Sequence, residues 1–270
     1  MRLGLGSYTY TWAIGVPGRP PAQPLTAPDL VRRAAAAGVG CVQIADNLPL
    51  DALGDGERRD LRTLAVEMAV AIEVGARGLT AERLERFLDL AVFFHSPILR
   101  FVIDGPGYQP TVDSVVAVVR EALPRLRASG VRLAIENHDR FPTRTLVEVV
   151  ERLGARHVGI CLDTVNSFAA LEGPEVVVER LAPYALNLHV KDFTITRVNG
   201  QMGFAVEGAP AGQGRLAVPW LLRQLEAAGR DVNAILELWT PRASSVEETF
   251  EREAEWARAS VAYLRRLIPD

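Results

Sequence analysis

Four ionisable side chains stand where apolar segments in the second half of the sequence end. They are Glu136 after LAI, Asp163 after GICL, His189 after LNL and Glu237 after AIL. If these segments are neighbouring strands, three carboxylates and an imidazole share one water-poor site, where like charges are costly at close range. A divalent metal removes that cost, and this ligand set suits Mn²⁺ or Mg²⁺ and also Co²⁺ or Zn²⁺. Any one carboxylate could instead cap the following helix, so the prediction depends on all four residues together.

One amine lies two residues beyond the candidate histidine. Lys191 is the single lysine in a chain with 30 Lys and Arg residues, so arginine supplies every other side-chain cation of this kind. Side chains on a strand alternate between its faces, which points Lys191 to the same side as His189. A lysine, unlike an arginine, can lose its proton when it is desolvated or lies beside another cation. The alternative is a strand-end ion pair with Asp192.

The elements that must position these residues follow from a repeated pattern. Short apolar segments alternate with longer ones whose apolar residues recur at helical spacing and whose ends carry Gly or Pro. The predicted strands cover residues 3–7, 38–45, 69–75, 97–104, 131–136, 157–163, 185–191 and 233–239. The predicted helices cover residues 27–38, 58–68, 80–94, 111–130, 143–154, 174–183, 218–229 and 244–267. Eight such units of about 30 residues predict a single (β/α)₈ TIM barrel.

We expect this barrel to occupy residues 1–270 as one domain, because no change of composition marks a boundary. Chemistry in such barrels takes place at the carboxyl ends of the strands, where the four candidate ligands lie. The alternative fold, a doubly wound sheet, would need a glycine-rich phosphate fingerprint after the first strand, and LGLGSYTY does not supply one. The segments 8–24 and 192–215 are predicted to be long loops.

The composition argues against several other classes of protein. A net charge of −3, with arginines scattered among Asp and Glu, gives no surface for nucleic acid or an anionic membrane. No apolar run reaches the ~18 residues of a transmembrane helix and the start lacks a signal pattern, so we expect a cytoplasmic protein. Cys41 and Cys161 lie in apolar strand-like segments and are expected to be reduced core residues.

Several segments of the sequence are similar to one known family. The segments are ENHD at 136–139, CLDTVNS at 161–167, LHVKD at 188–192, GAPAGQGRLAVPWLL at 208–222 and LELW at 236–239. They resemble the sugar phosphate isomerase/epimerase group of xylose isomerase-like TIM barrels. The resemblance implies that Glu136, Asp163, His189 and Glu237 hold one divalent metal, whose shell is completed by oxygens of a small carbohydrate or sugar acid.

Two positions depart from the ketose 3-epimerases of that group. Those enzymes place a histidine three residues after the metal aspartate and an arginine a little beyond the metal histidine, where this chain has Asn166 and Ile195. The segments YTYTWAIG, EVGARG, ENHDRFP, HVKDF and VEGAPAGQG look more like the 3-oxo-isoapionate decarboxylase branch. That branch removes CO₂ from a branched oxo-sugar acid, and a sugar isomerase or epimerase is the alternative.

Both reactions use a metal-stabilised enediolate. In a decarboxylase we expect Lys191, with a pKa lowered by the metal, to hold the substrate carboxylate or to protonate the carbanion. In an isomerase, Glu237 or Glu136 would move the proton. His138 is a further catalytic candidate because strand alternation puts it on the face of Glu136; its alternative is a histidine that supports a metal ligand. The candidate substrate-binding residues are Tyr8, Tyr10, Glu73, His138, Asn166, Lys191 and Trp239.

Each of these assignments has an alternative. The aromatic residues can be core or loop packing, Glu73 is assigned because it closes the third strand, and a buried Arg100 needs an ion-pair partner. Lys191 could form a Schiff base without metal. An abasic-site endonuclease would need more metal ligands and a basic face, and a metal-free binding module is the non-enzyme alternative. The C-terminal helix at 244–267 could form a homo-oligomer or close the barrel.

Overall fold

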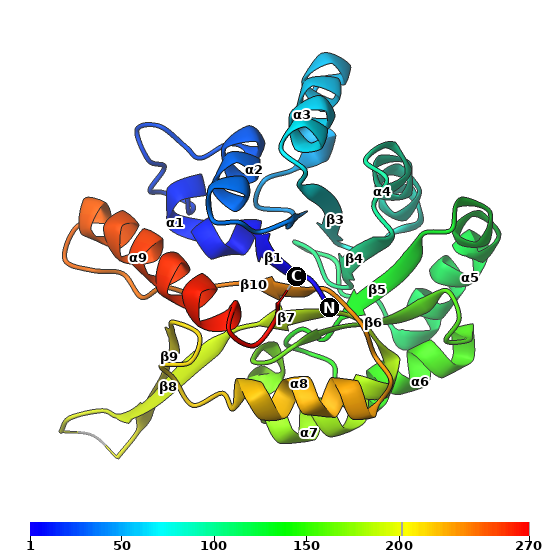
Figure 1. Ribbon diagram of the computed structural model, residues 1–270. Helices are drawn as coiled ribbons and strands as arrows, with labels where there is room; N and C mark the ends of the chain where they lie inside the picture. Colours follow the sequence, from blue (N-terminus) through cyan, green and yellow to red (C-terminus); the bar gives the residue numbers. More distant parts are fainter. Residues whose placement is uncertain (201, 270) are drawn as a thin grey trace.

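Parallel strands close into a barrel (Figure 1). The computed structural model describes residues 1–200 and 202–269. Within these residues eight strands pair in the order β1-β10-β7-β6-β5-β4-β3-β2, and β2 pairs back to β1. The barrel strands are β1 (Leu3–Gly6), β2 (Cys41–Ile44), β3 (Ala71–Arg77), β4 (Ile98–Val102), β5 (Arg132–Glu136), β6 (Val158–Asp163), β7 (Ala185–Val190) and β10 (Ala234–Leu236). The predicted (β/α)₈ TIM barrel is therefore confirmed, and a doubly wound sheet is wrong.

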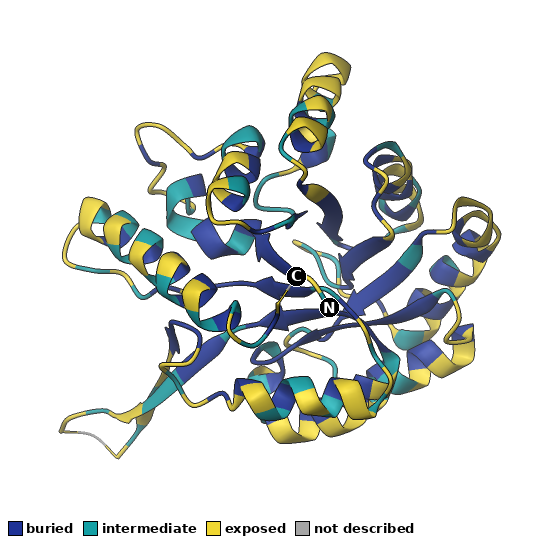
Figure 2. Cartoon of the chain, in the orientation of Figure 1, coloured by how far each residue is buried: buried dark blue, intermediate teal, exposed yellow. Residues whose placement is uncertain are grey.

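Helices surround the strands, with their exposed faces outward and their buried faces on the barrel (Figure 2). They are α2 (Ala27–Ala36), α3 (Asp55–Glu67), α4 (Ala81–Phe93), α5 (Val112–Ser129), α6 (Thr143–Leu153), α7 (Pro174–Leu181), α8 (Val218–Ala227) and α9 (Val246–Leu264). Local signals define their ends: Thr26 and Asp29 form a capping box at the start of α2, and Gly130, with φ of 74°, ends α5 in the left-handed region. Sequence and structure therefore agree on each of these helices to within a few residues.

The core explains why the barrel strands are apolar along their length. All residues of β6 and β7 are buried, because side chains on one face fill the barrel and those on the other meet the helices. Phe101 of β4, for example, meets Phe87 of α4 edge to face, with ring centroids 6.2 Å apart. A polar or ionisable residue within such a strand must therefore find its partners inside the barrel.

Two segments predicted to be loops contain regular structure. Residues 8–24 begin within a 3₁₀ helix, Ser7–Tyr10, which leads into α1 (Thr11–Ile14). Residues 192–215 contain an antiparallel hairpin of β8 (Asp192–Arg197) and β9 (Phe204–Ala209) that projects from the barrel (Figure 1), although Gln201 lies outside the described residues. The hairpin signal was present as alternating Thr, Ile and Val around the turn-forming pair Asn199-Gly200. The other short elements are the 3₁₀ helices Leu50–Ala52, Asn166–Ala170 and Ala182–Tyr184.

The remaining predictions about the whole chain concern its cysteines, membranes and last helix. Cys41 and Cys161 are buried and free, as expected. Among the described residues, no helix has the length and apolar character needed to cross a membrane. In α9, Leu264 is buried in the core and Trp256 packs against it, so these two residues help to close the barrel.

Candidate functional site

The four candidate ligands meet at the carboxyl ends of consecutive barrel strands. Glu136 ends β5, Asp163 ends β6, His189 is the next-to-last residue of β7, and Glu237 follows β10. The Nδ1 atom of His189 lies 3.4 Å from Oε2 of Glu136. The same atom lies 3.5 Å from Oδ2 of Asp163 and 3.5 Å from Oε2 of Glu237. All four residues are buried, so the structure brings together the set that strand order suggested.

Several of the atoms that face one another in this group lack hydrogen bonds. Asp163 Oδ2, His189 Nδ1 and both carboxylate oxygens of Glu237 are buried without a hydrogen-bond partner. Buried polar atoms are nearly always bonded, so several unbonded atoms around one point require a physical reason. Carboxylate oxygens and an imidazole nitrogen are ligands of Mn²⁺, Mg²⁺, Co²⁺ and Zn²⁺. The residues therefore fit a divalent cation.

Glu136 has a partner on each carboxylate oxygen. Its Oε2 accepts a hydrogen bond from Nε of the buried Arg100 on β4, and its Oε1 accepts one of 2.7 Å from Nδ2 of Asn166. Burial alone would raise the pKa of Glu136, but the positive charges of Arg100, His189 and Lys191 together outweigh burial, and the pKa lies below its ordinary value. The expectation that Arg100 needs an ion-pair partner is confirmed, and the partner is a candidate ligand.

Backbone donors orient the ligand from β6, and a side-chain acceptor orients the one from β7. Oδ1 of Asp163 accepts hydrogen bonds of 2.9 Å from the backbone N–H groups of Val165 and Asn166, which leaves Oδ2 turned to the site. Nε2 of His189 lies 2.7 Å from Oε1 of Gln43, so Nδ1 is the ring nitrogen that faces the carboxylates. The loop after β6 and the strand β2 therefore help to set the geometry of the site.

Lys191 joins this group from the end of β7. Its Nζ lies 2.8 Å from Oδ2 of Asp163 and 2.8 Å from Oε2 of Glu237, close ion pairs whose angles are not those of hydrogen bonds. Lys191 and His189 thus point the same way, as predicted. Burial lowers the pKa of Lys191, but the charges of Asp163, Glu237 and Glu136 outweigh burial, so the pKa lies above its ordinary value. Without a metal ion the carboxylates therefore stabilise the ammonium, and a lowering of the pKa by a bound metal stays a prediction.

Asp192 is not the partner of Lys191, and that alternative is wrong. The Asp192 carboxylate is buried and accepts backbone hydrogen bonds of 2.8–3.0 Å. The donors are Phe193, Gly212, Gly214 and Leu216. Asp192 therefore fixes the glycine-rich segment after the hairpin instead of neutralising the lysine.

A cleft of about 570 Å³ opens beside the candidate ligands. Four of the predicted substrate-binding residues line it: Tyr8, Asn166, Lys191 and Trp239. The indole N–H groups of Trp12 and Trp239 donate to the backbone oxygens of Thr240 and Asp192, at 2.8 and 3.0 Å, which fixes both rings in the wall. The hydroxyl of Tyr8 donates to Asp46 at 3.0 Å. The wall is therefore aromatic on one side and ends at the ammonium of Lys191.

The other predicted substrate-binding residues are not among those that line this cleft. Tyr10 lies in the hydrophobic core, where the 3₁₀ helix places it, with the Arg33 guanidinium 4.6 Å from its ring centre, which is the core packing named as its alternative. Glu73 is the third residue of β3, not its end, and is buried inside the barrel. β5 ends at Glu136, so strand alternation does not reach His138, whose Nδ1 lies 2.9 Å from Asp139. A substrate role for His138 stays a prediction.

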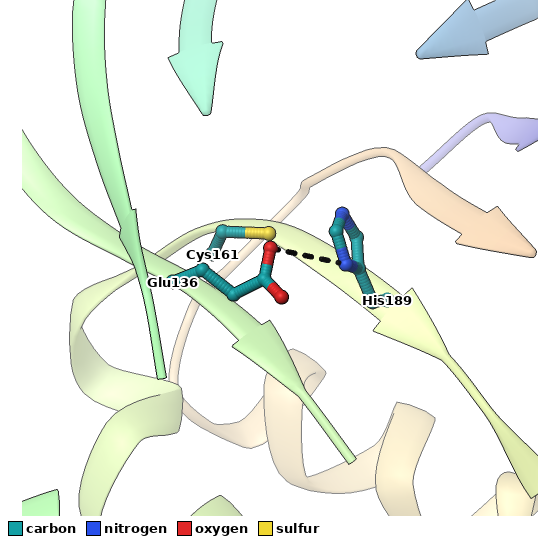
Figure 3. A group of neighbouring side chains, drawn as sticks. All are labelled: Glu136, Cys161 and His189. Carbon is teal, nitrogen blue, oxygen red and sulfur yellow. Dashed lines mark ion pairs between the residues drawn. The ribbon is translucent and has the colours of Figure 1, made fainter. Parts of the chain in front are cut away.

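Sequence reasoning missed the polar residues beneath the ligands. Gln43 and Asn187 lie on β2 and β7, and both are buried; Cys161 of β6, expected in the core, lies beside them. The signal was a polar residue inside a short apolar strand, as in CVQI and LNL. The sulfur of Cys161, an oxygen of Glu136 and a nitrogen of His189 lie within 4.8 Å of one another (Figure 3). Burial raises the pKa of the Cys161 thiol to about 11, so without a metal ion the thiol keeps its proton.

Comparison with known proteins identifies a family and a relative that match almost the whole chain. A family model described as "Xylose isomerase-like TIM barrel" matches residues 11–267. The 3-oxo-isoapionate decarboxylase of Pectobacterium atrosepticum is 34% identical over 264 residues, which cover 98% of this chain and 95% of the relative.

Solved structures with the same fold are more distant in sequence. D-psicose 3-epimerase with D-tagatose, from Clostridium cellulolyticum H10, has a TM-score of 0.74 at 14% identity, covering 98% of this chain and 99% of its own. A xylose isomerase-like TIM barrel protein from Mycobacterium smegmatis, in complex with magnesium, has a TM-score of 0.69 at 16% identity, with 97% of each chain covered. At these identities the likeness establishes the fold alone.

Proposed function

This chain belongs to the xylose isomerase-like TIM barrel family, and we propose that it is a divalent-metal-dependent lyase of carbohydrate catabolism that decarboxylates a 3-oxo sugar acid of the 3-oxo-isoapionate type. The relative from Pectobacterium atrosepticum, which is named for that reaction, supports this choice. The observation that carries the proposal is the position of Lys191, whose ammonium contacts two candidate ligands and also lines the cleft. A cation there suits a substrate that carries a carboxylate.

In this proposal Glu136, Asp163, His189 and Glu237 hold the cation, with Mn²⁺ or Mg²⁺ preferred and Co²⁺ or Zn²⁺ as alternatives. The buried atoms without hydrogen bonds in this group support that assignment. When bound, the cation supplies an electron sink at the substrate's carbonyl and neighbouring hydroxyl oxygens. We expect a chelator to abolish turnover and added Mn²⁺ to restore it.

Lys191 acts on the carboxylate of the substrate. Its ammonium binds the carboxylate at the cleft floor, while Asp163 and Glu237, 2.8 Å away, keep the ammonium charged and oriented. The bond between the carboxylate carbon and its neighbouring carbon breaks, CO₂ leaves, and the bonding electron pair moves to the carbonyl oxygen. No base takes part in that step. Lys191 then gives a proton to the carbanionic carbon and regains one from solvent through the cleft.

The test is NMR in D₂O of the Mn²⁺- or Mg²⁺-supplemented protein, quenched and stripped of metal, with a panel of ketoses and 3-oxo sugar acids. Loss of the carboxylate carbon together with deuterium at the adjacent carbon is expected with a 3-oxo sugar acid. The protein treated with a chelator serves as the control. If no member of the panel loses carbon or exchanges hydrogen in the metal-loaded protein, the proposed function is wrong.

A sugar isomerase or epimerase is the second candidate, and the paired glutamates favour it. Glu136 and Glu237 each have an oxygen within 3.5 Å of Nδ1 of His189, so both lie where a proton could be moved at a bound sugar. Exchange of deuterium beside the carbonyl without loss of carbon would select this reaction. The proton transfer would then pass to the two glutamates, and Lys191 would bind a hydroxyl or phosphate group of the sugar.

A further inference from the structure

A group of amide side chains and one carboxylate fills the barrel beneath the candidate ligands. Glu73 of β3 is its centre, 2% exposed, and it faces Gln43 of β2 and Asn187 of β7. Asn233, just before β10, completes the group. Neither the proposed reaction nor the cleft uses these residues, yet burying a carboxylate is costly unless it is bonded.

Burial raises the pKa of Glu73, and the amide N–H groups of Asn233, Gln43 and Asn187 oppose that rise. With Glu73 ionised, the hydrogen bonds of this group have one consistent direction. A carboxylate accepts and cannot donate when ionised, so each amide must turn its NH₂ toward Glu73. Gln43 Nε2 lies 3.0 Å and Asn187 Nδ2 3.1 Å from Oε2 of Glu73, and Asn233 Nδ2 lies 2.7 Å from Oε1. Gln43 Nε2 also donates to Oδ1 of Asn187 at 3.0 Å. A flipped Gln43 would bring its oxygen against two acceptors, so its orientation is fixed.

The fixed amide of Gln43 reaches the candidate metal ligand. Its Oε1 lies 2.7 Å from Nε2 of His189 and can only accept, so Nε2 must carry the hydrogen. In the neutral ring Nδ1 then presents its lone pair to the site, where the nearest atoms belong to Glu136, Asp163 and Glu237. Without the acceptor at Nε2, those carboxylates would favour the hydrogen on Nδ1, where it would block a cation.

We propose that Glu73 and Gln43 are positioning residues that hold His189 in the Nε2–H tautomer, so that Nδ1 is available to a divalent cation. Glu73 acts through Gln43 and touches neither the cation nor the substrate. This inference rests on the metal site of the proposed function. It assigns a role to a carboxylate that the sequence alone had suggested for substrate binding.

The test measures metal affinity and the histidine ring separately in Gln43→Leu and in Glu73→Gln, which is closely isosteric. Mn²⁺ binding is followed by electron paramagnetic resonance titration, and we expect it to weaken by roughly 10- to 100-fold in both variants. The ring Nε2–H of His189 is observed by ¹⁵N-edited NMR of histidine-labelled protein, metal-free and with diamagnetic Mg²⁺. We expect a slowly exchanging Nε2–H in the wild type and its loss in Gln43→Leu.

Ser96→Ala is the matched control. The Ser96 hydroxyl is buried next to β4, accepts from the Val74 N–H and donates to the Ile98 oxygen, so its loss also removes buried hydrogen bonds from β3 and β4. We expect Ser96→Ala to lower stability while leaving Mn²⁺ affinity and the Nε2–H signal unchanged. The inference would be overturned if both Glu73→Gln and Gln43→Leu bound Mn²⁺ as tightly as the wild type. An unchanged Nε2–H signal in Gln43→Leu would also overturn it. If wild-type protein binds no Mn²⁺, the proposed function fails, and the NMR signal still tests the tautomer.

Discussion

At the residue scale, the site contains buried side chains of both charges inside the barrel. The three carboxylates belong to Glu136, Asp163 and Glu237. The two positively charged side chains are those of Arg100 and Lys191. Arg100 donates a hydrogen bond to Glu136. The ammonium of Lys191 instead lies beside Oδ2 of Asp163, an atom that also faces Nδ1 of His189. Arg100 therefore serves one ligand, and Lys191 is the cation that can meet both ligands and substrate.

The first prediction separates the role of Lys191 from metal binding. Lys191→Met removes the ammonium that contacts Asp163 and Glu237. We expect turnover to fall by roughly 10²–10⁴-fold, because the carboxylate loses its partner and the carbanion its acid. Mn²⁺ affinity should hold or increase, because an ammonium no longer repels the cation. Steady-state CO₂ release and Mn²⁺ titration measure the two effects.

Arg140→Met is the control for that prediction. Arg140 pairs with Asp104 and stacks on Phe141, and it is not among the residues that line the cleft. Its loss removes one positive charge and should leave CO₂ release nearly unchanged. Full turnover in Lys191→Met, or weaker Mn²⁺ binding there, would contradict the role given to the lysine.

The second prediction concerns metal removal. A cation held by the native state alone stabilises it by about 2.7 kcal/mol at one hundred times its dissociation constant. For a chain of this size that corresponds to a rise in Tm of roughly 5–10 °C on adding Mn²⁺, which a chelator should reverse. Asp163→Asn should lose the rise, because it removes a buried ligand oxygen, whereas Asp104→Asn, outside the site, should keep it. Scanning calorimetry with and without Mn²⁺ decides; an equal rise in Asp163→Asn would mean that the cation binds elsewhere.

At the element scale, the hairpin and the segment after it complete the cleft. Val206 of β9 and Trp239 both line the cleft, and Trp239 packs directly over Gly208 of β9. The carboxylate of Asp192, at the start of β8, holds the N–H groups of the glycine-rich segment. An isolated two-stranded hairpin is barely stable in water, so these contacts with the barrel hold it in place.

The third prediction follows from the close packing at Gly208. A methyl group there would lie 2.4–2.9 Å from atoms of Trp239, including its backbone oxygen, so something must move. We expect Gly208→Ala to lower the free energy of unfolding by about 1–3 kcal/mol, to raise KM and to shift the tryptophan fluorescence. Gly203→Ala, in the same segment with no atom within 4 Å, should change stability by less than about 1 kcal/mol. Equal behaviour of the two variants in urea unfolding would show that Gly208 does not position Trp239.

At the scale of the whole molecule, the last helix, α9, is hydrogen-bonded to the segment that follows β1. Glu253 of α9 is buried, and its carboxylate oxygens accept the backbone N–H groups of Trp12 and Ala13 at 2.8 and 3.0 Å. Trp12 is a wall of the cleft. Residues near the two ends of the sequence are therefore hydrogen-bonded to each other at one side of the cleft, where the barrel closes and the function is proposed.

The fourth prediction is a pH dependence from this junction. Burial raises the pKa of Glu253 from its ordinary value of 4.5 to about 7. The folded state thus binds more protons than the unfolded state between these values, so the stabilisation present below pH 4.5 is lost as pH rises through about 7. We expect the free energy of unfolding of the wild type to fall, relative to Glu253→Gln, by up to about 3 kcal/mol over this range.

Urea unfolding at a series of pH values measures that difference. Glu251→Gln, an exposed position on the same helix, is the control and should follow the wild type. A constant difference between wild type and Glu253→Gln from pH 4.5 to 7 would mean that Glu253 stays ionised, held by the two N–H groups. A parallel change of KM with pH would further tie the junction to the wall at Trp12.

The sequence by itself determined the barrel and the place of the four candidate ligands. Alternating apolar segments and amphipathic helices specify strands covered on both faces, and strand order then brings Glu136, Asp163, His189 and Glu237 to one mouth. The orientation of Lys191 toward the side of His189 could also be predicted, because strand alternation is a local rule. The structure places Tyr10 in the core, Glu73 inside β3 and His138 beyond the end of β5, because local rules do not say where a strand stops or which way a turn directs a ring.

Only the tertiary structure decided the partners of the buried polar groups. Gln43, Glu73, Asn187 and Asn233 lie far apart in the sequence, and their hydrogen bonds depend on the closure of the barrel. The same holds for Arg100 with Glu136 and for Glu253 with the first loop. Hydrogen bonds act over about 3 Å and in fixed directions, so their pairing requires the three-dimensional register of the strands, whereas hydrophobic burial is non-directional and can be read from the periodicity of residues.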